Sequence, residues 1–96
     1  MADYVLSIQA VLDLQAIADY GYATFGVAKA REYGEALEQR FEQLAESPAM
    51  GVQADEFANG LRRFKQGSHW IFYVEQADGI FVARVLHERM DFVRHL

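Results

Sequence analysis

The sequence predicts an α+β fold in which an N-terminal helical hairpin packs on one side of a mainly antiparallel four-stranded sheet, in the order β-α-α-β-β-β. Two observations support this prediction. Apolar residues recur at spacings of three and four from about residue 10 to residue 46, which is the period of amphipathic helices. They alternate with a period of two near the N-terminus and again between residues 61 and 87, as in strands. The length of 96 residues fits one domain, 1–96.

The first strand is predicted at residues 4–8, with Tyr4, Leu6 and Ile8 on one side. A helix follows from about residue 10, because the apolar positions change to helical spacing. Its stripe consists of Leu14, Ile17, Ala18, Gly21 and Phe25. Asp13 is predicted to lie in the first turn, where a carboxylate suits the positive end of the helix dipole. Gly26 is predicted to end this helix in a left-handed conformation.

A second helix is predicted at residues 27–46. Its apolar stripe consists of Ala30, Gly34, Leu37, Phe41 and Leu44. Glycine in mid-helix costs up to ~1 kcal/mol relative to alanine. We therefore expect Gly34 to allow close approach of the first helix near Ala18 and Gly21, which makes an αα-hairpin. Ser47 ends the helix, because the residue before proline is disfavoured in helical space. Residues 50–60 are predicted to form a loop.

Three further strands are predicted at residues 61–66, 69–75 and 80–86 or 87, joined by turns at Gly67-Ser68 and Asp78-Gly79. In the strand at 69–75, alternation puts one set of side chains, Trp70, Phe72 and Val74, on one face and the other set, Ile71 and Tyr73, on the opposite face. The strand from residue 80 is apolar on both faces up to Ala83, so it is predicted to lie inside the sheet. Residues 91–96 form a short tail with room for one helical turn.

The composition excludes several classes of function. The chain has no cysteine, which excludes disulfides, thiolate zinc sites and cysteine nucleophiles. Its N-terminus carries Asp3 and Asp13 without a basic segment, and its longest apolar run, WIFYV, is far below the ~20 residues that span a bilayer. We therefore expect a cytoplasmic protein without membrane contact. The net charge of −5 argues against direct sequence-specific binding of nucleic acid by this chain alone.

No cofactor or metal site is predicted, since glycine-rich phosphate loops and metal-ligand motifs are missing from the sequence. His87 and Asp91 have a spacing that suits two ligands on one helix face. However, Arg84 and Arg89 lie beside them and would repel a metal cation. Three serines, Ser7, Ser47 and Ser68, fall at a strand end, a helix end and a hairpin turn, so no nucleophilic serine is predicted.

The positive charge is confined to the C-terminal third. Residues 61–96 hold six basic and four acidic residues and all three histidines, whereas residues 1–60 hold three basic and ten acidic residues. An anionic partner is therefore expected to meet the C-terminal third. The candidate contacts there are Arg62, Arg63, Lys65, Arg84, His87 and Arg89. For the first three, the alternative is that they only deter edge-to-edge pairing of strands.

Arg84 and His87 each have two interpretations. Alternation along the strand places Arg84 on the face of Ile80, Val82 and Leu86, and His87 on the opposite face. An unpaired arginine in so apolar a strand costs several kcal/mol. Arg84 therefore pairs either with a carboxylate of this chain, such as Asp91 or Glu88, or with an acidic group of a partner. His87 either caps the strand end through backbone hydrogen bonds or acts as a general acid or base near neutral pH.

The aromatic residues indicate both a core and a docking surface. Those on the later strands, Phe64, Trp70, Phe72 and Tyr73, are predicted to be core. The hairpin carries Tyr20, Tyr22, Phe25 and Tyr33, too many for one buried stripe. Some of these are therefore expected to be exposed and to bind another chain.

A series of motifs runs nearly end to end through the chain. The helical part contains YxLS at 4–7, DLxxIxxY at 13–20 and AxxYxxxLxxxFxxLAxxP at 30–48. The strands contain LRRF at 61–64, GSHxIFY at 67–73 and RVLHxRMD at 84–91, an ordered combination that is more specific than any helix motif. With these motifs the chain resembles the ParE toxins of the RelE/ParE superfamily, the toxin half of bacterial type II toxin–antitoxin modules.

The resemblance implies the β-α-α-β-β-β fold, a cytoplasmic location and a ParD-like antitoxin partner encoded beside the toxin, in a heteromeric complex expected to be a heterotetramer. It also implies growth inhibition by a protein inhibitor that poisons DNA gyrase and is not a catalyst. The resemblance supplies no residue list for gyrase inhibition. Mainly on the charge and strand arguments, contacts with target or antitoxin are therefore assigned to Arg62, Arg63, Lys65, Arg84, His87, Arg89, Met90, Tyr20 and Tyr33.

RelE relatives offer an enzymatic alternative, since they cleave messenger RNA on the ribosome. In that case Arg62 and Arg84 would contact phosphate and His87 would transfer the proton. Some of these nucleases use a C-terminal tyrosine or histidine, and the tail FVRHL has no tyrosine, which is a departure from their pattern. A third alternative is a degenerate toxin that survives as a binding module.

Overall fold

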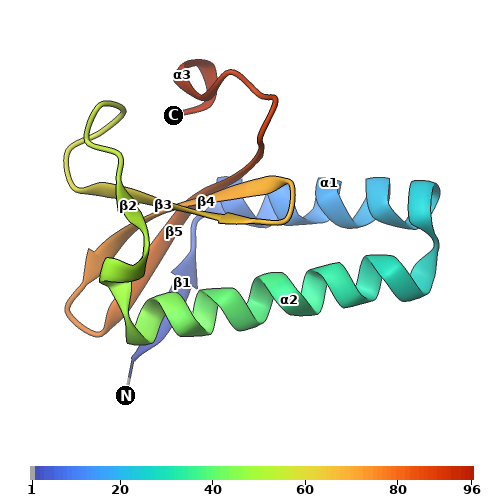
Figure 1. The fold of residues 1–96 in the computed structure, drawn as a ribbon, viewed down its shortest axis with the longest axis horizontal. Coiled ribbons are helices and arrows are strands. Elements are labelled where there is room, and N and C mark those ends of the chain that lie inside the picture. The colour runs from blue at the N-terminus through green and yellow to red at the C-terminus, as the bar shows by residue number, and fades with distance from the viewer. Residues whose placement is uncertain (1) are drawn as a thin grey trace.

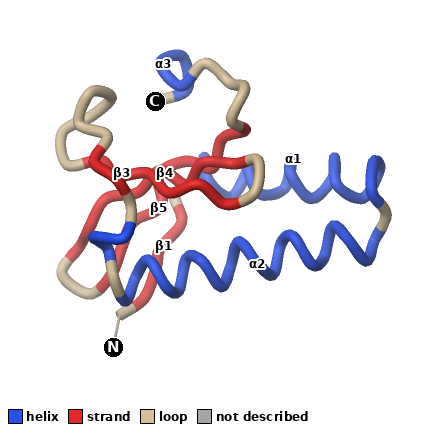
Figure 2. Tube along the Cα trace, in the orientation of Figure 1, coloured by secondary structure: helices blue, strands red, loops and turns tan. Residues whose placement is uncertain are grey.

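The computed structural model describes residues 2–96 and has the predicted α+β architecture (Figures 1 and 2). Its elements are β1 (Asp3–Leu6), α1 (Ile8–Phe25), α2 (Val27–Glu46), a 3-10 turn η1 (Pro48–Met50), β2 (Val52–Gln53), β3 (Leu61–Gln66), β4 (His69–Gln76), β5 (Gly79–His87) and α3 (Phe92–His95). The strand order is β1-β5-β4-β3-β2, with β1 parallel to β5 and the other pairs antiparallel. β5 lies between β1 and β4, as its apolar sequence predicts.

The hairpin of α1 and α2 covers one face of the sheet and projects beyond it, whereas α3 lies on the other side (Figure 1). The helix α1 begins at Ile8, two residues earlier than predicted, because Ser7 caps it. The Ser7 hydroxyl accepts a hydrogen bond from the Ala10 N–H at 2.9 Å and donates one to the Ala83 carbonyl at 2.6 Å. Ile8 is therefore exposed on the helix and not part of the strand. Asp13 lies in the second turn, so its predicted role at the helix dipole is wrong.

The predicted reason for Gly34 is also wrong. A Cβ atom at Gly34 would meet nothing within 4 Å. The close contact between the helices lies instead at Gly21, where a Cβ would be 3.2 Å from the Cβ of Ala30. Gly34 therefore makes no helix–helix contact that offsets its low helix propensity.

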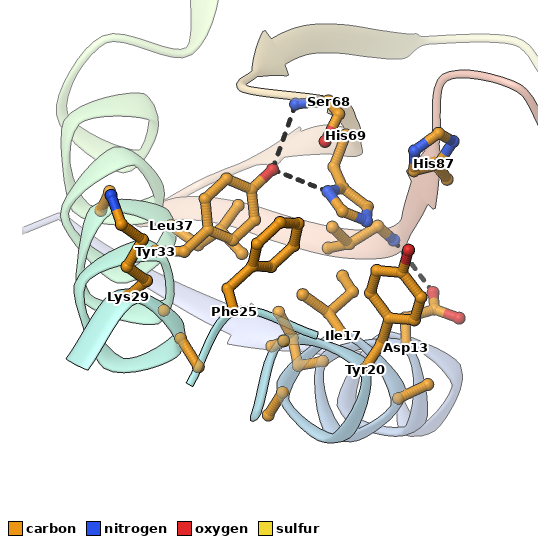
Figure 3. A pocket seen from close by; sticks show the side chains of 18 of the residues that line it. Asp13, Ile17, Tyr20, Phe25, Lys29, Tyr33, Leu37, Ser68, His69 and His87 are labelled. Atoms are coloured by element: carbon orange, nitrogen blue, oxygen red, sulfur yellow. Dashed lines mark hydrogen bonds between the residues drawn. The ribbon is translucent and has the colours of Figure 1, made fainter. Parts of the chain in front are cut away.

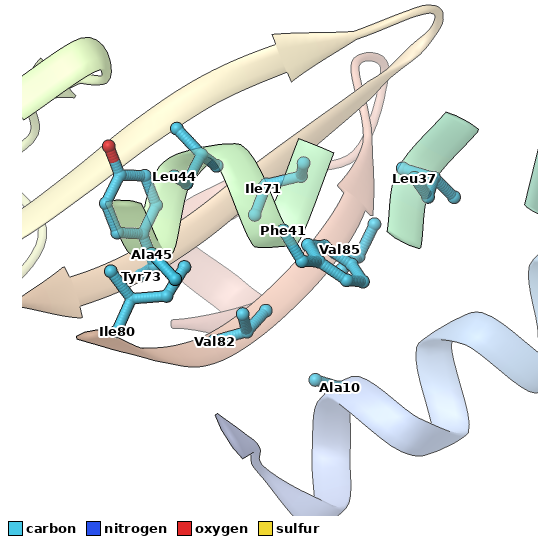
Figure 4. Close-up of a cluster of buried hydrophobic side chains, with 10 residues drawn as sticks. All are labelled: Ala10, Leu37, Phe41, Leu44, Ala45, Ile71, Tyr73, Ile80, Val82 and Val85. Carbon is cyan, nitrogen blue, oxygen red and sulfur yellow. The ribbon is translucent and has the colours of Figure 1, made fainter. Parts of the chain in front are cut away.

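A separate apolar core lies on each face of the sheet. The core under the hairpin contains Ala10, Leu37, Phe41, Leu44, Ala45, Ile71, Tyr73, Ile80, Val82 and Val85 (Figure 4). The core on the other face contains Ala54, Leu61, Phe72 and Leu86, with Phe57, Trp70, Val74 and Phe92 packed against it. The alternation predicted for β4 is thus confirmed, and the four predicted core aromatics all pack in one core or the other.

A β-bulge in β5 changes the predicted faces. Tyr73 pairs with Val82, but the preceding Phe72 pairs with Arg84, so Ala83 is an extra residue on β5. Ile80 and Val82 consequently face the hairpin, while Arg84 stands opposite Phe72 of the second core. The predicted common face of Arg84 with Ile80 and Val82 is therefore wrong, because simple alternation does not count the bulged residue.

The predicted loop at 50–60 contains a strand, which makes five strands in the described residues where four were predicted. The two residues of β2 pair with Arg62 and Arg63 of β3. The buried Tyr73 hydroxyl holds the chain ahead of β2, since it donates to the Pro48 carbonyl at 2.7 Å and accepts from the Gly51 N–H at 2.9 Å. A Cβ at Gly51 would lie on this hydroxyl, so glycine is needed for the approach.

We expect Tyr73→Phe to lower the free energy of unfolding by ~1–3 kcal/mol, because it leaves a carbonyl and an N–H without their partner. Urea unfolding followed by circular dichroism measures the difference. The control is Tyr22→Phe at an exposed tyrosine, which is expected to change stability by less than ~0.5 kcal/mol. Equal stability of the two variants would show that the Tyr73 hydroxyl does not hold this segment.

Candidate functional site

A groove of about 970 Å³ runs between α1 and α2 and ends against the sheet (Figure 3). Its sides are mainly apolar, and Leu14 and Ile17 of α1 and Leu37 of α2 line it along with Val85 of β5. Its inner end, next to the sheet, is formed by Tyr33, Ser68, His69, His87 and Met90. We call these five residues the inner end of the groove. The groove therefore combines apolar walls with one polar end, which is the usual make-up of a binding site.

Exposed aromatic rings stand over the outer part of the groove. Tyr20 is 66% exposed and Phe25 is 61% exposed, and their ring centroids are 6.3 Å apart. Both rings border the opening (Figure 3). The predicted exposure of hairpin aromatics is thus confirmed. Large exposed apolar surfaces of this kind are uncommon in monomers and indicate binding of another molecule.

Gly34 keeps the wall of the groove open on the α2 side. It lines the groove, and outside the neighbouring backbone of α2 no described atom lies within 4 Å of the position that its Cβ would take. A glycine inside a helix destabilises the helix by up to ~1 kcal/mol relative to alanine. No close contact among residues 2–96 requires a glycine here, and its position leaves the groove open on this side.

The Tyr33 hydroxyl organises the inner end of the groove. It lies 2.9 Å from the Gln66 carbonyl, 2.7 Å from His69 Nδ1 and 3.2 Å from the Ser68 N–H. A carbonyl only accepts, so the single hydroxyl proton is donated to Gln66 and the hydroxyl accepts from the other two groups. His69 therefore carries a proton on Nδ1 and presents a lone pair on Nε2. Burial, followed by the neighbouring His87, lowers the pKa of His69, so its ring is neutral at pH 7.

His87 stands beside His69 at the end of β5. The two imidazole centroids are 5.2 Å apart and the rings are nearly perpendicular. The Nδ1 atom of His87 accepts a hydrogen bond from the Arg89 N–H at 3.1 Å. The predicted capping of the strand end by His87 through a backbone hydrogen bond is thus confirmed. A role as general acid or base stays a prediction.

Arg84 forms an ion pair within the chain, as one of its two interpretations predicted, but with Asp13. Its Nε and Nη2 atoms donate to the two carboxylate oxygens of Asp13, each at 2.8 Å, and Nη1 donates to the His95 carbonyl at 2.7 Å. The side chains are only 17% and 13% exposed. Hydrogen bonding to Asp13 raises the pKa of Arg84. The suggested partners Asp91 and Glu88 are wrong. The carboxylate comes from Asp13 in α1, which is 71 residues away in the sequence.

Asp13 also completes the sheet edge. β1 pairs with β5 only as far as Val82, so the next part of β5 lacks a neighbouring strand on that side. The Asp13 carboxylate accepts the Val85 N–H at 2.9 Å, and Ser7 binds the Ala83 carbonyl. One carboxylate thus neutralises a half-buried guanidinium and satisfies a backbone donor, joining α1 to β5.

The structure does not bring the remaining predicted basic residues into one patch. Arg62 stands opposite Tyr73 and donates to the Gly51 carbonyl, whereas Arg63 stands opposite Phe72 on the other face. The Arg63 guanidinium lies 4.5 Å from the Trp70 ring centroid and 5.9 Å from that of Phe57, and its buried Nε has no hydrogen-bond partner among residues 2–96. Lys65 pairs with Glu88 at 3.2 Å.

The three groups assigned to a nuclease do not converge either. Arg62 pairs with Tyr73 and His87 with His69, positions four residues apart on β4, or ~13 Å at strand spacing. Arg84 is bonded to Asp13. Within residues 2–96, no group of three or more His, Cys, Asp or Glu side chains is placed to hold a metal ion. No helix in the same range is long and apolar enough to cross a bilayer.

Four of the nine predicted contact residues, Tyr20, Tyr33, His87 and Met90, line the groove. Sequence reasoning missed His69 and Gly34 as groove residues. His69 had a usable signal, because it alternates with Ile71 and Tyr73 and so faces the hairpin. Gly34 had no such signal, since a glycine in the middle of a helix is equally consistent with a helix–helix contact and with an open groove.

Three comparisons relate the chain to known proteins. The family model described as "ParE toxin of type II toxin-antitoxin system, parDE" matches residues 4–92. Toxin ParE1 of Mycobacterium tuberculosis is 39% identical over 94 residues, covering 97% of this chain and 96% of the relative. Toxin ParE1 of Caulobacter vibrioides is 36% identical over 96 residues, covering 100% and 99%. The predicted resemblance is thereby confirmed.

A solved structure titled "Chromosomal ParDE TA system from P. aeruginosa" has a TM-score of 0.75 and 18% identity to the chain. The match covers 91% of this chain and 96% of that one. At this identity it shows a shared fold, which confirms the predicted fold class.

Proposed function

Since the chain belongs to the ParE toxin family of type II toxin–antitoxin systems, we propose that it inhibits growth by poisoning DNA gyrase and that a ParD-like antitoxin neutralises it by occupying the groove between α1 and α2. The toxin acts in this proposal as a protein inhibitor, not as a catalyst. The complex with the antitoxin is heteromeric, and we propose a heterotetramer. Toxin and antitoxin meet in the cytoplasm.

The groove is the observation that supports the antitoxin site. Its apolar walls, the exposed rings of Tyr20 and Phe25 and the open position at Gly34 suit an amphipathic helix laid into a hydrophobic groove. A flexible antitoxin segment that folds there loses conformational entropy worth several kcal/mol. Burial of the aromatic surface offsets that loss.

Supercoiling by purified DNA gyrase tests the proposed target. Addition of the chain is expected to abolish supercoiling or to stabilise cleaved DNA, and addition of the antitoxin encoded by the neighbouring reading frame is expected to restore activity. Unchanged supercoiling without stabilised cleavage would contradict the gyrase target. Messenger RNA cut within ribosomes, and lost with His87→Ala, would instead establish the nuclease alternative.

Two substitutions at Gly34 are expected to have different effects, one on the stability of the domain and the other on its affinity for the antitoxin. Gly34→Ala raises the free energy of unfolding by up to ~1 kcal/mol, since alanine is the better helix former and its Cβ has free space. Gly34→Phe places a ring in the groove and is expected to weaken antitoxin binding at least ~10-fold, a difference of ~1.4 kcal/mol. Isothermal titration calorimetry measures the affinity.

The matched control for Gly34→Phe is Glu35→Phe, which adds the same ring at the next residue, on the exposed face of α2 outside the groove. Its affinity for the antitoxin is expected to equal that of the wild type. Equal affinity of Gly34→Phe and Glu35→Phe would show that the antitoxin binds elsewhere.

A further inference from the structure

We infer that the inner end of the groove is a subsite for one carboxylate side chain of the neutralising partner, held by His69 and His87, and that the partner consequently binds more tightly as the pH falls. The inference rests on the proposed function, because it concerns the same groove and the same partner. The inference names the chemical group of the partner that binds at the inner end of the groove.

Each imidazole uses one nitrogen for the fold and leaves the other free. His69 Nδ1 is bonded to the Tyr33 hydroxyl, and His87 Nδ1 accepts from the Arg89 N–H. Within residues 2–96 neither Nε2 atom has a hydrogen-bond partner. Both side chains line the groove (Figure 3), so a polar group of the occupant reaches two unused ring nitrogens at the end of an apolar channel.

The charges around the histidines favour an anion. Two carboxylates, Asp13 and Glu88, act on His69 and favour its protonated form, but each is in an ion pair, Asp13 with Arg84 and Glu88 with Lys65. Arg89 lies two residues after His87 in the sequence, and its side chain forms no ion pair with any described residue. The helix α2 contributes Tyr33 to the inner end of the groove. The charged residues of α2 that line the rest of the groove are Lys29, Glu32 and Glu38. An incoming carboxylate therefore meets two imidazole rings at the inner end of the groove, with the cation of Arg89 two residues beyond His87 on the chain.

A carboxylate beside His69 couples binding to proton uptake. The free chain holds His69 neutral at pH 7, because burial and His87 lower its pKa. A bound carboxylate favours the imidazolium form and raises that pKa. The complex therefore binds a proton that the free chain does not, and affinity increases as the pH falls until the free His69 is itself protonated.

If the occupant instead places a hydroxyl or amide group at His69, the affinity is expected to change with pH in the opposite direction. Such a group would donate to the Nε2 lone pair of His69, and protonation of Nε2 would remove that acceptor. Its affinity would fall with decreasing pH. The direction of the pH dependence therefore distinguishes the two chemistries.

The test is calorimetric titration of the chain with the antitoxin encoded by the neighbouring reading frame, at about pH 7.5 and about pH 6, within the range where histidine titrates. Each pH is measured in two buffers of different ionisation heat, which gives the number of protons taken up. We expect uptake approaching one proton at the higher pH and an affinity that rises by up to ~10-fold per pH unit.

Asparagine variants identify the histidines. His69→Asn keeps a donor for the Tyr33 hydroxyl and His87→Asn keeps an acceptor for the Arg89 N–H, so both preserve the local hydrogen bonds while removing the imidazole ring. We expect His69→Asn to abolish proton uptake and His87→Asn to weaken binding at low pH. His95→Asn, in the C-terminal tail outside the groove, is the matched control and leaves both unchanged. Replacement of the antitoxin's carboxylates by amides, one at a time, is expected to identify a single residue that carries the uptake.

The possible outcomes are distinguishable. A complex that forms without proton uptake, or with uptake that persists in His69→Asn, overturns the carboxylate subsite and leaves the proposed function standing. Affinity that falls with decreasing pH also overturns it. Absence of any complex overturns the antitoxin partner and the subsite together. The proton count on the wild-type chain decides the matter even if an asparagine variant does not fold.

Discussion

Phe41→Asp is expected to leave no folded protein at 25 °C. The Phe41 ring is fully buried where α2 meets the sheet, and it packs against Tyr4 with ring centroids 5.2 Å apart. Removal of a buried phenylalanine costs about 3–5 kcal/mol, and the desolvated carboxylate adds several kcal/mol. Together these losses approach the whole stability of a small domain, about 5–15 kcal/mol. Far-ultraviolet circular dichroism and the urea midpoint measure the result.

The matched control is Phe25→Asp, the same change at an exposed ring beside the groove. It is expected to change the free energy of unfolding by less than ~0.5 kcal/mol, because the ring is mostly exposed and little buried surface is lost. Its affinity for the antitoxin is expected to fall, since the ring borders the proposed site. Retention of cooperative unfolding by Phe41→Asp would contradict the position of the core.

Asp13→Ala is expected to destabilise the domain by ~3–5 kcal/mol, the cost of leaving a buried charge without its partner. Arg84 would lose both carboxylate oxygens and keep only the His95 carbonyl, and the Val85 N–H would lose its acceptor. The loss would loosen the contact between α1 and β5 next to the groove. Chemical denaturation of the variant measures the change in the free energy of unfolding.

A double-mutant cycle separates the ion pair from the rest of the loss. Arg84→Leu combined with Asp13→Ala removes the unpaired charge and is expected to recover more than half of the stability lost in Asp13→Ala. The control is disruption of the exposed Lys65–Glu88 pair by Glu88→Ala, with an expected effect below ~1 kcal/mol. An Asp13→Ala effect as small as this control would show that the pair does not hold the helix to the sheet.

The elements with regular periodicity could be predicted from the sequence. The apolar stripe of α2 continues for about four turns, and the helix ends before a proline, so both its position and its buried face followed from spacing. The apolar run in β5 identified a strand with neighbours on both sides. The exposure of aromatic residues on the hairpin could also be predicted, because the hairpin carries more aromatic rings than one buried stripe can hold.

The errors fall where contact depends on residues far apart in sequence or on a single local irregularity. The strand β2 has two residues, too few for any period. The bulge at Ala83 reverses the faces of the strand without a glycine or proline to mark it. The pair of Asp13 and Arg84 spans 71 residues. The role of His69 depends on a tyrosine hydroxyl from α2, which no spacing in the strand indicates.

The position of β5 also determines when the fold can form. This strand is the neighbour of both β1 and β4, yet it is the last strand that the ribosome synthesises. β1, made first, waits for a partner that emerges about 75 residues later, and the guanidinium that joins α1 to the C-terminal tail comes from the same late strand. Such long-range closure is slow compared with helix formation. The native sheet can therefore form only after β5 has been synthesised, because until then β1 has no neighbouring strand.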